Sequence, residues 1–188
     1  MKFYSGFSLK NEDCFFDLFI DKSDYSVSGF SYGAIRAFEY VNECMACGKR
    51  VDRLQLFSPA FFQNKSESFK KLQLRSFVKN RQKYMGSFIN SCFFPHAMLD
   101  VEMIDGTLEE LEELLYYEWS LSELKNICAK GVRIEVYLGG KDNIIDAKNA
   151  KEFFKEVATI TYIKDANHFL WSHGFNHAKS YSEVNQYD

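Results

Sequence analysis

The sequence predicts an α/β fold in a single domain, and three observations lead to this prediction. A short β-prone run, a glycine-containing turn and a helical segment follow one another between residues 25 and 41. Two later runs, residues 132–138 and 159–163, alternate as strands do, and each leads into a polar loop. The chain has 188 residues and is 46% hydrophobic, which is enough for one well-buried domain and gives no reason to expect two.

Each element has a local basis in the sequence. β-branched and aromatic residues favour short strands, and glycines mark the turns between elements. Helix formers with apolar side chains at 34, 38 and 41 predict a helix directly after the first such turn. In chain order we expect a strand at 1–4, a loop at 5–8, a helix at 11–19, strands at 25–28 and 54–57, and the two later strands.

The turn after the strand at 25–28 carries a Gly-x-Ser-x-Gly pattern, formed by Gly29, Ser31 and Gly33. Glycines have no Cβ, so the chain can turn sharply and neighbouring elements can pack close to the turn. The serine hydroxyl then stands at the tip, as in a nucleophile elbow. Because such five-residue patterns also occur by chance, the pattern alone leaves a structural turn and a catalytic Ser31 equally open.

A catalytic serine needs a base, and the base needs an acid that holds its tautomer. Asp142 and His168 each follow one of the two later strands, in the chain order serine, aspartate, histidine. Alone, each would more often be a turn or surface residue. Together with the elbow they predict a catalytic triad. Asp146 as the acid, and His173 or His177 as the base, are weaker alternatives because none of them follows a strand directly.

Acyl transfer also needs two backbone N–H groups that bind the developing oxyanion. The residue after the nucleophile, which is Tyr32 here, supplies one of them. The loop after an early strand supplies the other. Within the loop at 5–8, we expect the N–H of Phe7 to be this second donor.

Five blocks of sequence carry a family resemblance that runs from the first residues to about position 170. The blocks are Ser5-Gly6-Phe7-Ser8-Leu9, Gly29-Phe30-Ser31-Tyr32-Gly33-Ala34, Leu56-Phe57-Ser58-Pro59-Ala60-Phe61-Phe62, Gly139-Gly140-Lys141-Asp142 and Ala166-Asn167-His168-Phe169. In chain order they resemble the α/β-hydrolase esterases of biotin synthesis, and more narrowly the short BioV family of pimeloyl-acyl-carrier-protein methyl ester esterases. The resemblance implies an α/β-hydrolase fold, a serine carboxylesterase and an acyl carrier protein that delivers the substrate.

The sequence departs from the usual hydrolase pattern in ways that predict a reduced fold with a mostly parallel sheet. Ser5-Gly6 stands where His-Gly is common, and residues 20–24 leave no room for a strand and a helix that normally precede the elbow. We expect one domain over 1–188, with a core at 1–58 and 132–171 and a helical lid at 59–131. A shortened sheet leaves an edge that must be covered, so the oligomeric state stays open.

The charges of the expected lid are segregated. Residues 61–85 hold seven basic residues and one acidic residue, whereas residues 100–123 hold nine acidic residues and no basic one. On one continuous helix, basic side chains at every fourth residue would form a stripe. The two alternatives for this stripe are that it docks a partner or that it is a solvated face. Docking would suit the acidic acyl carrier protein implied by the resemblance. The stripe consists of Lys71, Arg75, Lys79 and Lys83.

Six aromatic residues of the same region would line an acyl channel under this function, although core packing is the alternative for most of them. They are Phe88, Phe93, Phe94, Tyr116, Tyr117 and Trp119.

Composition narrows the function further. A formal charge of −3 argues against a generic nucleic-acid binder. Five scattered cysteines are expected to be reduced thiols, with Cys44 and Cys47 at a helix end. Neither they nor His168, His173 and His177 show a metal-ligand pattern, so we expect no metal and no cofactor. The lack of a leader and of a long apolar run predicts a cytoplasmic protein.

Two other classes of function stay open from sequence. One is an acyl thioesterase or a generic small-ester carboxylesterase, because a triad can attack either bond. The other is a non-catalytic hydrolase-fold module that binds an acyl group, although a complete serine, aspartate and histidine set argues against it. The polar segment 172–188 has no assigned function.

Overall fold

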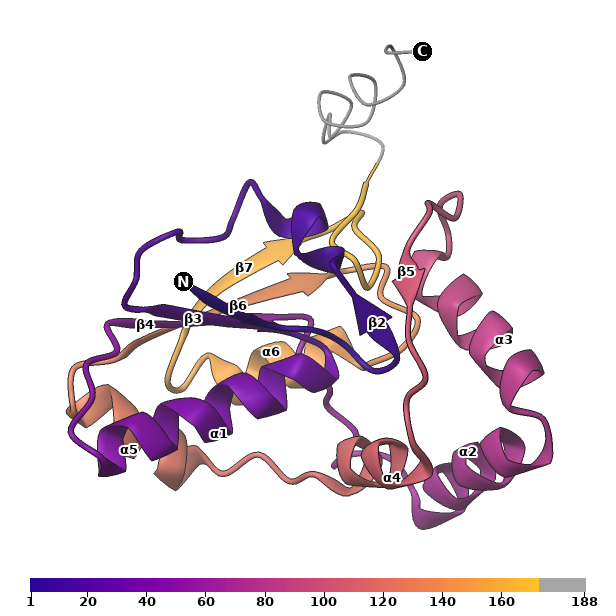
Figure 1. The fold of residues 1–188 in the computed structure, drawn as a ribbon, viewed down its shortest axis with the longest axis horizontal. Helices are drawn as coiled ribbons and strands as arrows, with labels where there is room; N and C mark the ends of the chain where they lie inside the picture. The colour runs from indigo at the N-terminus through magenta and orange to yellow at the C-terminus, as the bar shows by residue number, and fades with distance from the viewer. Residues whose placement is uncertain (173–188) are drawn as a thin grey trace, which may run out of the picture.

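The computed structural model describes residues 1–172 and is built around a five-stranded parallel sheet (Figure 1). The strand order is β1-β3-β4-β6-β7, and all four neighbouring pairs are parallel. The predicted α/β architecture with a mostly parallel sheet is therefore confirmed. The strands are β1 (Lys2–Tyr4), β3 (Ser26–Phe30), β4 (Arg53–Phe57), β6 (Arg133–Gly139) and β7 (Thr159–Ile163).

Three helices, α1 (Tyr32–Ala46), α5 (Leu121–Ala129) and α6 (Ala147–Phe154), lie on one face of the sheet (Figure 1). The apolar positions 34, 38 and 41 of α1 are fully buried against the alternate residues of β3, β4 and β6 that point to this face. The helical periodicity of the sequence thus predicted the buried stripe of α1 correctly. All five cysteines are free, and Cys47 caps the end of α1.

On the opposite face, the carboxyl-terminal half of the sheet is aromatic. Phe30 of β3, Phe57 of β4 and Tyr137 of β6 form a second apolar cluster with the 3-10 helix η1 (Glu12–Phe16). The Phe16 ring stacks on that of Phe57, with their centroids 4.7 Å apart. This cluster packs against the carboxyl ends of the strands, where the loops of the site begin.

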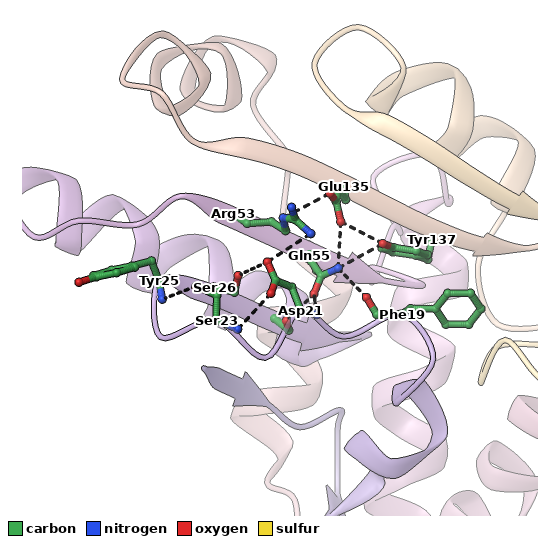
Figure 2. Close-up of polar contacts among 10 residues, drawn as sticks. Phe19, Asp21, Ser23, Tyr25, Ser26, Arg53, Gln55, Glu135 and Tyr137 are labelled. Atoms are coloured by element: carbon green, nitrogen blue, oxygen red, sulfur yellow. Dashed lines mark hydrogen bonds and ion pairs between the residues drawn. The ribbon is translucent and has the colours of Figure 1, made fainter. Parts of the chain in front are cut away.

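The amino-terminal half of the same face carries a polar network around the buried Gln55 side chain (Figure 2). Its Nε2 lies 2.8 Å from the Phe19 carbonyl oxygen and 2.9 Å from a Glu135 oxygen, and its Oε1 accepts the N–H of Asp21. Arg53 forms ion pairs with Asp21 and Glu135. The network ties the chain before β3 to the sheet.

The helix predicted at 11–19 is wrong in length and type. Only Glu12–Phe16 is helical, as the 3-10 helix η1, and the following residues run as turns and loop to β3. Asn11 begins the element in the left-handed region, with a φ of 60°. The Phe19 carbonyl and the Asp21 N–H bond to Gln55 and not to helical neighbours, so the helix does not continue past this point.

Four elements lie between β4 and α5: α2 (Glu67–Lys79), α3 (Arg81–Phe93), β5 (Glu102–Met103) and α4 (Leu108–Tyr116). β5 pairs antiparallel with β2 (Leu9–Lys10), so this region is tied to the loop after β1. α5 instead lies beside α1 and leads into β6 (Figure 1). The extent of the lid at 59–131 stays a prediction.

The single helix expected for the basic stripe is wrong. The chain turns at Asn80, which has extended backbone angles and whose side chain accepts the Lys83 N–H at the start of α3. Lys71, Arg75 and Lys79 therefore lie on α2, and Lys83 lies on α3. Within residues 1–172, no helix is both long and apolar enough to cross a membrane.

Candidate active site

Ser31 forms a sharp turn between β3 and α1. Its φ of 52° and ψ of −114° are rare for a serine and are typical of a strained nucleophile elbow. Three hydrogen bonds hold the turn. The Ser31 N–H donates to the Phe57 carbonyl at 2.9 Å, and the Ser31 carbonyl accepts the N–H groups of Ala34 and Ala60, each at 3.1 Å. The surrounding backbone therefore fixes the unusual conformation of Ser31.

Gly33 is required by close packing of the elbow against the loop after β1. A Cβ at this position would lie 2.0 Å from the carbonyl oxygen of Tyr4 and 2.5 Å from that of Ser5. Real Cβ atoms do not approach backbone this closely, so only glycine fits. The sequence prediction that neighbouring elements pack close to the elbow is confirmed, and it brings the expected oxyanion loop, residues 5–8, next to Ser31.

Asp142 lies in the loop after β6, where its carboxylate is held on two sides. Oδ1 accepts the N–H groups of Ile144 and Ile145 at 2.8 and 3.0 Å, which leaves Oδ2 for His168. The strand before it ends at Gly139, where a Cβ would lie 2.2 Å from the Asn167 carbonyl oxygen. The glycine thus lets the aspartate loop touch the histidine loop.

The structure brings the three predicted residues into one hydrogen-bonded chain. His168 Nδ1 lies 2.7 Å from Asp142 Oδ2, and His168 Nε2 lies 3.0 Å from Ser31 Oγ. The side chains of His168 and Asp142 are completely buried, and Ser31 is 5% exposed. The Phe30 ring packs against the imidazole, with centroids 5.0 Å apart. This is the geometry of a serine hydrolase triad, while the catalytic roles themselves stay a prediction.

The alternative acid has a different structural role. Asp146 caps the amino terminus of α6, because its Oδ1 accepts the Asn149 N–H at 3.0 Å. Asp142, not Asp146, is therefore the partner of His168. The alternative bases His173 and His177 lie outside the described residues.

The two expected oxyanion donors flank the elbow. Tyr32 is the first residue of α1, so its N–H has no carbonyl partner within the helix. Its hydroxyl donates to Glu113 Oε2 of α4 at 2.6 Å, which ties the elbow to the lid region. Phe7 is buried, and its ring packs against Phe77 and Phe88 of α2 and α3. The oxyanion role of both N–H groups stays a prediction.

Sequence reasoning missed Asn167, which anchors the histidine loop. Its buried side chain donates from Nδ2 to the Phe93 carbonyl at 2.8 Å and accepts the Trp171 N–H at 3.1 Å. The His168 N–H donates to the Cys92 carbonyl at 3.3 Å. Both carbonyls belong to the last turn of α3, where they lack helical partners. Only the position of Asn167 directly before His168 could have indicated this role.

A cavity of about 690 Å³ lies between α2, α3, α4 and the loops of the site. Phe7 and Ile144 place it beside the oxyanion loop and the aspartate loop, and Leu111 and Leu115 of α4 add apolar wall. Of the six aromatic residues expected to line an acyl channel, only Phe88 lines this cavity. The others include the buried Trp119 and Phe93 and the largely exposed Phe94.

Two of the four residues of the basic stripe also line this cavity. Lys79 and Lys83 are exposed and therefore stand at its rim, whereas Lys71 and Arg75 are not among the lining residues. Lys71 forms an ion pair with Glu67 one turn earlier on α2, with the two atoms 3.1 Å apart. The partner-binding role of all four stays a prediction.

Comparison with solved structures defines the fold. An esterase from Exiguobacterium antarcticum superposes with a TM-score of 0.57 and 14% identity, covering 75% of this chain and 58% of its own. BioG from Haemophilus influenzae superposes with a TM-score of 0.55 and 11% identity, covering 89% of this chain and 87% of its own. Naproxen esterase from Bacillus subtilis superposes with a TM-score of 0.50 and 20% identity, covering 87% of this chain and 61% of its own. No protein-family model and no curated protein sequence matches the chain.

These likenesses, at 11 to 20% identity, establish the fold and not the activity. The chain has the α/β-hydrolase fold. It spans about three fifths of the length of the two esterases, so the fold is present in a shortened form.

Substitution of Gly33 tests whether the elbow depends on the close approach of the Tyr4 and Ser5 backbone. We expect Gly33→Ala to lower the free energy of unfolding by about 2 kcal/mol or more, because the added methyl group has to displace the backbone of Tyr4 and Ser5. Urea unfolding followed by fluorescence measures this effect. The matched control is Gly86→Ala on α3, where a Cβ meets no atom within 4 Å and should stabilise the protein slightly. Equal effects of the two substitutions would contradict the close approach at the elbow.

Proposed function

We propose that the protein is a serine carboxylesterase. The observation that carries this proposal is the hydrogen-bonded chain from Ser31 through His168 to Asp142, with each residue at the carboxyl end of a parallel strand. The strained serine turn supports it, because such a turn presents a nucleophile. The names of two solved structures of the same fold, both esterases, are consistent with it.

The proposed mechanism follows from this arrangement. Asp142 accepts the Nδ1–H of His168, which leaves Nε2 as the base that removes the Ser31 proton. The serine oxygen attacks the ester carbonyl, and the N–H groups of Phe7 and Tyr32 bind the oxyanion. His168 then protonates the departing alcohol. Water, activated by the same imidazole, hydrolyses the acyl-serine and releases the acid.

We further propose that the substrate is the methyl ester of pimeloyl-acyl carrier protein in biotin synthesis, with methanol and pimeloyl-acyl carrier protein as products. The support is the BioV-like sequence blocks, the largely apolar cavity beside the site and the cations at its rim. The apolar wall suits an acyl chain, and Lys79 and Lys83 suit an acidic carrier protein or its phosphate-bearing arm. This function would place the protein in the cytoplasm.

The carrier-protein surface proposed here consists of Lys71, Arg75, Lys79 and Lys83. Arg75, Lys79 and Lys83 form no ion pair with any residue of 1–172, so their charges are available to a partner. The neighbouring Leu72 and Val78 of α2 are exposed by 58% and 68%, which gives the basic face an apolar component.

The serine role has a direct test. Wild-type protein should react with a fluorophosphonate probe and hydrolyse p-nitrophenyl butyrate, whereas Ser31→Ala should lose labelling and lower kcat by roughly 10⁴-fold or more. Gel fluorescence and steady-state kinetics measure these effects. Ser68→Ala, an exposed serine of α2, is the matched control and should behave as wild type. Equal labelling of Ser31→Ala and wild type would eliminate the esterase proposal.

The substrate proposal predicts a specific bond cleavage. After incubation with methyl-pimeloyl-acyl carrier protein, intact-mass analysis should show loss of the methyl group alone, because the ester and not the thioester is attacked. Reversing two stripe charges, in Arg75→Glu together with Lys79→Glu, should lower kcat/KM for this substrate about 10 to 100-fold through lost charge pairing. Hydrolysis of p-nitrophenyl butyrate by the same variant should change less than about 2-fold, since no stripe residue belongs to the triad.

Lys125→Glu on the exposed face of α5 is the control for a general change in net charge, and it should leave both rates near wild type. Loss of the whole acyl group from the carrier protein would favour the thioesterase alternative. Equal slowing of both substrates by the stripe variant would mean that the stripe is structural.

A further inference from the structure

Glu12 is a buried carboxyl group that the proposed mechanism does not use. The residue is 1% exposed, and its Oε1 accepts the Gly6 N–H at 2.6 Å. Its second oxygen, Oε2, is buried and has no hydrogen-bond partner within residues 1–172. A carboxyl group in this setting is costly, because burial of a charge or of an unpaired polar atom costs several kcal/mol.

Burial raises the pKa of the Glu12 carboxyl, and the hydrogen bond from the Gly6 backbone offsets part of this rise. The raised pKa means that the ionised form of Glu12 destabilises the fold at neutral pH. A glutamine would fill the same space without the buried charge. The carboxyl group is therefore poorly explained as a device for stability, and its 2.6 Å hydrogen bond to Gly6 connects it to the loop after β1.

That contact holds the peptide unit directly before the one that carries the expected oxyanion donor. The Gly6 carbonyl and the Phe7 N–H belong to one planar peptide unit and point in opposite directions. The Gly6 carbonyl accepts the Leu9 N–H at 3.1 Å, and the Gly6 N–H is held by Glu12. Both polar groups of Gly6 are thus fixed, and the orientation of the Phe7 N–H follows from them.

The far end of the loop is held by the lid region. Ser8 has a φ of 58°, and its carbonyl and hydroxyl accept the N–H groups of Ile104 and Gly106 at 3.0 and 3.1 Å. Glu12 is the matching anchor at the near end. Because Gly6 has no side chain, its own conformation would otherwise be the least restricted in the loop.

We propose that Glu12 is a positioning residue for the oxyanion loop, acting through the Gly6 N–H to aim the Phe7 N–H at the reacting carbonyl oxygen. The inference rests on the proposed esterase function. In this role the Glu12 side chain does not contact the substrate. The role requires an acceptor at the position of Oε1 and does not require a negative charge.

Three substitutions separate these requirements in the full-length protein. Glu12→Gln keeps an acceptor oxygen in place and should retain kcat for p-nitrophenyl butyrate within about 3-fold. Glu12→Leu removes the acceptor, and Glu12→Asp keeps the carboxyl but withdraws it by one methylene group. Both should lower kcat about 10 to 100-fold with KM changed less than about 2-fold, because an oxyanion contact acts in the transition state.

Inhibition by a boronic acid provides the decisive readout, since its tetrahedral adduct on Ser31 uses the oxyanion site. The inhibition constant of butylboronic acid should rise by the same factor as kcat falls, whereas that of butyrate, the product, should not change. Glu152→Leu, an exposed glutamate of α6, is the matched control and should alter neither. Near-UV circular dichroism identifies any variant that does not fold, and Glu12→Gln supplies the folded reference.

Thermal unfolding adds a readout of burial. A carboxyl group whose pKa is raised by folding favours the fold below its unfolded pKa and loses that contribution as the pH rises through the folded value. Glu12→Gln should therefore unfold at a higher temperature than wild type at pH 8 and close to it at pH 4.

The inference is overturned if folded Glu12→Leu and Glu12→Asp keep wild-type kcat, or if Glu12→Gln loses as much activity as they do. An unchanged boronic acid affinity in variants with low kcat would also overturn it. Failure of the proposed function is a different result, because wild-type protein would then show no Ser31-dependent hydrolysis at all.

Discussion

The candidate site depends on direct backbone contact between loops at the carboxyl ends of the parallel strands. Gly33 lets the loop after β1 lie against the elbow, and Gly139 lets the loop after β6 lie against the histidine loop. A side chain at either position would push the loops apart, and the hydrogen bonds of 2.7 and 3.0 Å within the site depend on their close approach. The geometry of Ser31, His168 and Asp142 is therefore a consequence of sheet order and of these two glycines.

The region between β4 and α5 has a structural role as well as a candidate binding role. The last carbonyls of α3 hold the histidine loop through Asn167 and the His168 N–H, and β5 holds the oxyanion loop through its pairing with β2. Glu113 of α4 holds the Tyr32 hydroxyl at the start of α1. In a shortened hydrolase fold, elements between β4 and α5 thus hold the histidine loop, the loop after β1 and the residue after Ser31. Large opening of α3 or β5 would disturb the histidine loop or the loop after β1.

Local sequence signals predicted the five strands of the parallel sheet, α1 and the positions of Ser31, Asp142 and His168 after strands, because each depends on neighbours in the chain. The Gly-x-Ser-x-Gly pattern and two polar residues after alternating strands needed no tertiary information. The 3-10 helix η1 could not be predicted, since Gln55 is 36 residues from Phe19 and competes for its carbonyl only in the fold. The break at Asn80 was visible in principle as a capping residue, but the regular spacing of basic residues concealed it. Glu12 and Asn167 became apparent only through burial and contact.

Trapping of an acyl-enzyme tests the central claim most directly. Wild-type protein turning over p-nitrophenyl butyrate would be quenched in acid, digested and analysed by peptide mass spectrometry. Nucleophilic catalysis by Ser31 predicts a butyryl group on the peptide that contains this serine, and on no other peptide, at an occupancy that follows the pre-steady-state release of p-nitrophenol. Rapid turnover by Ser31→Ala, or a butyryl group located on a different residue, would contradict the proposed function.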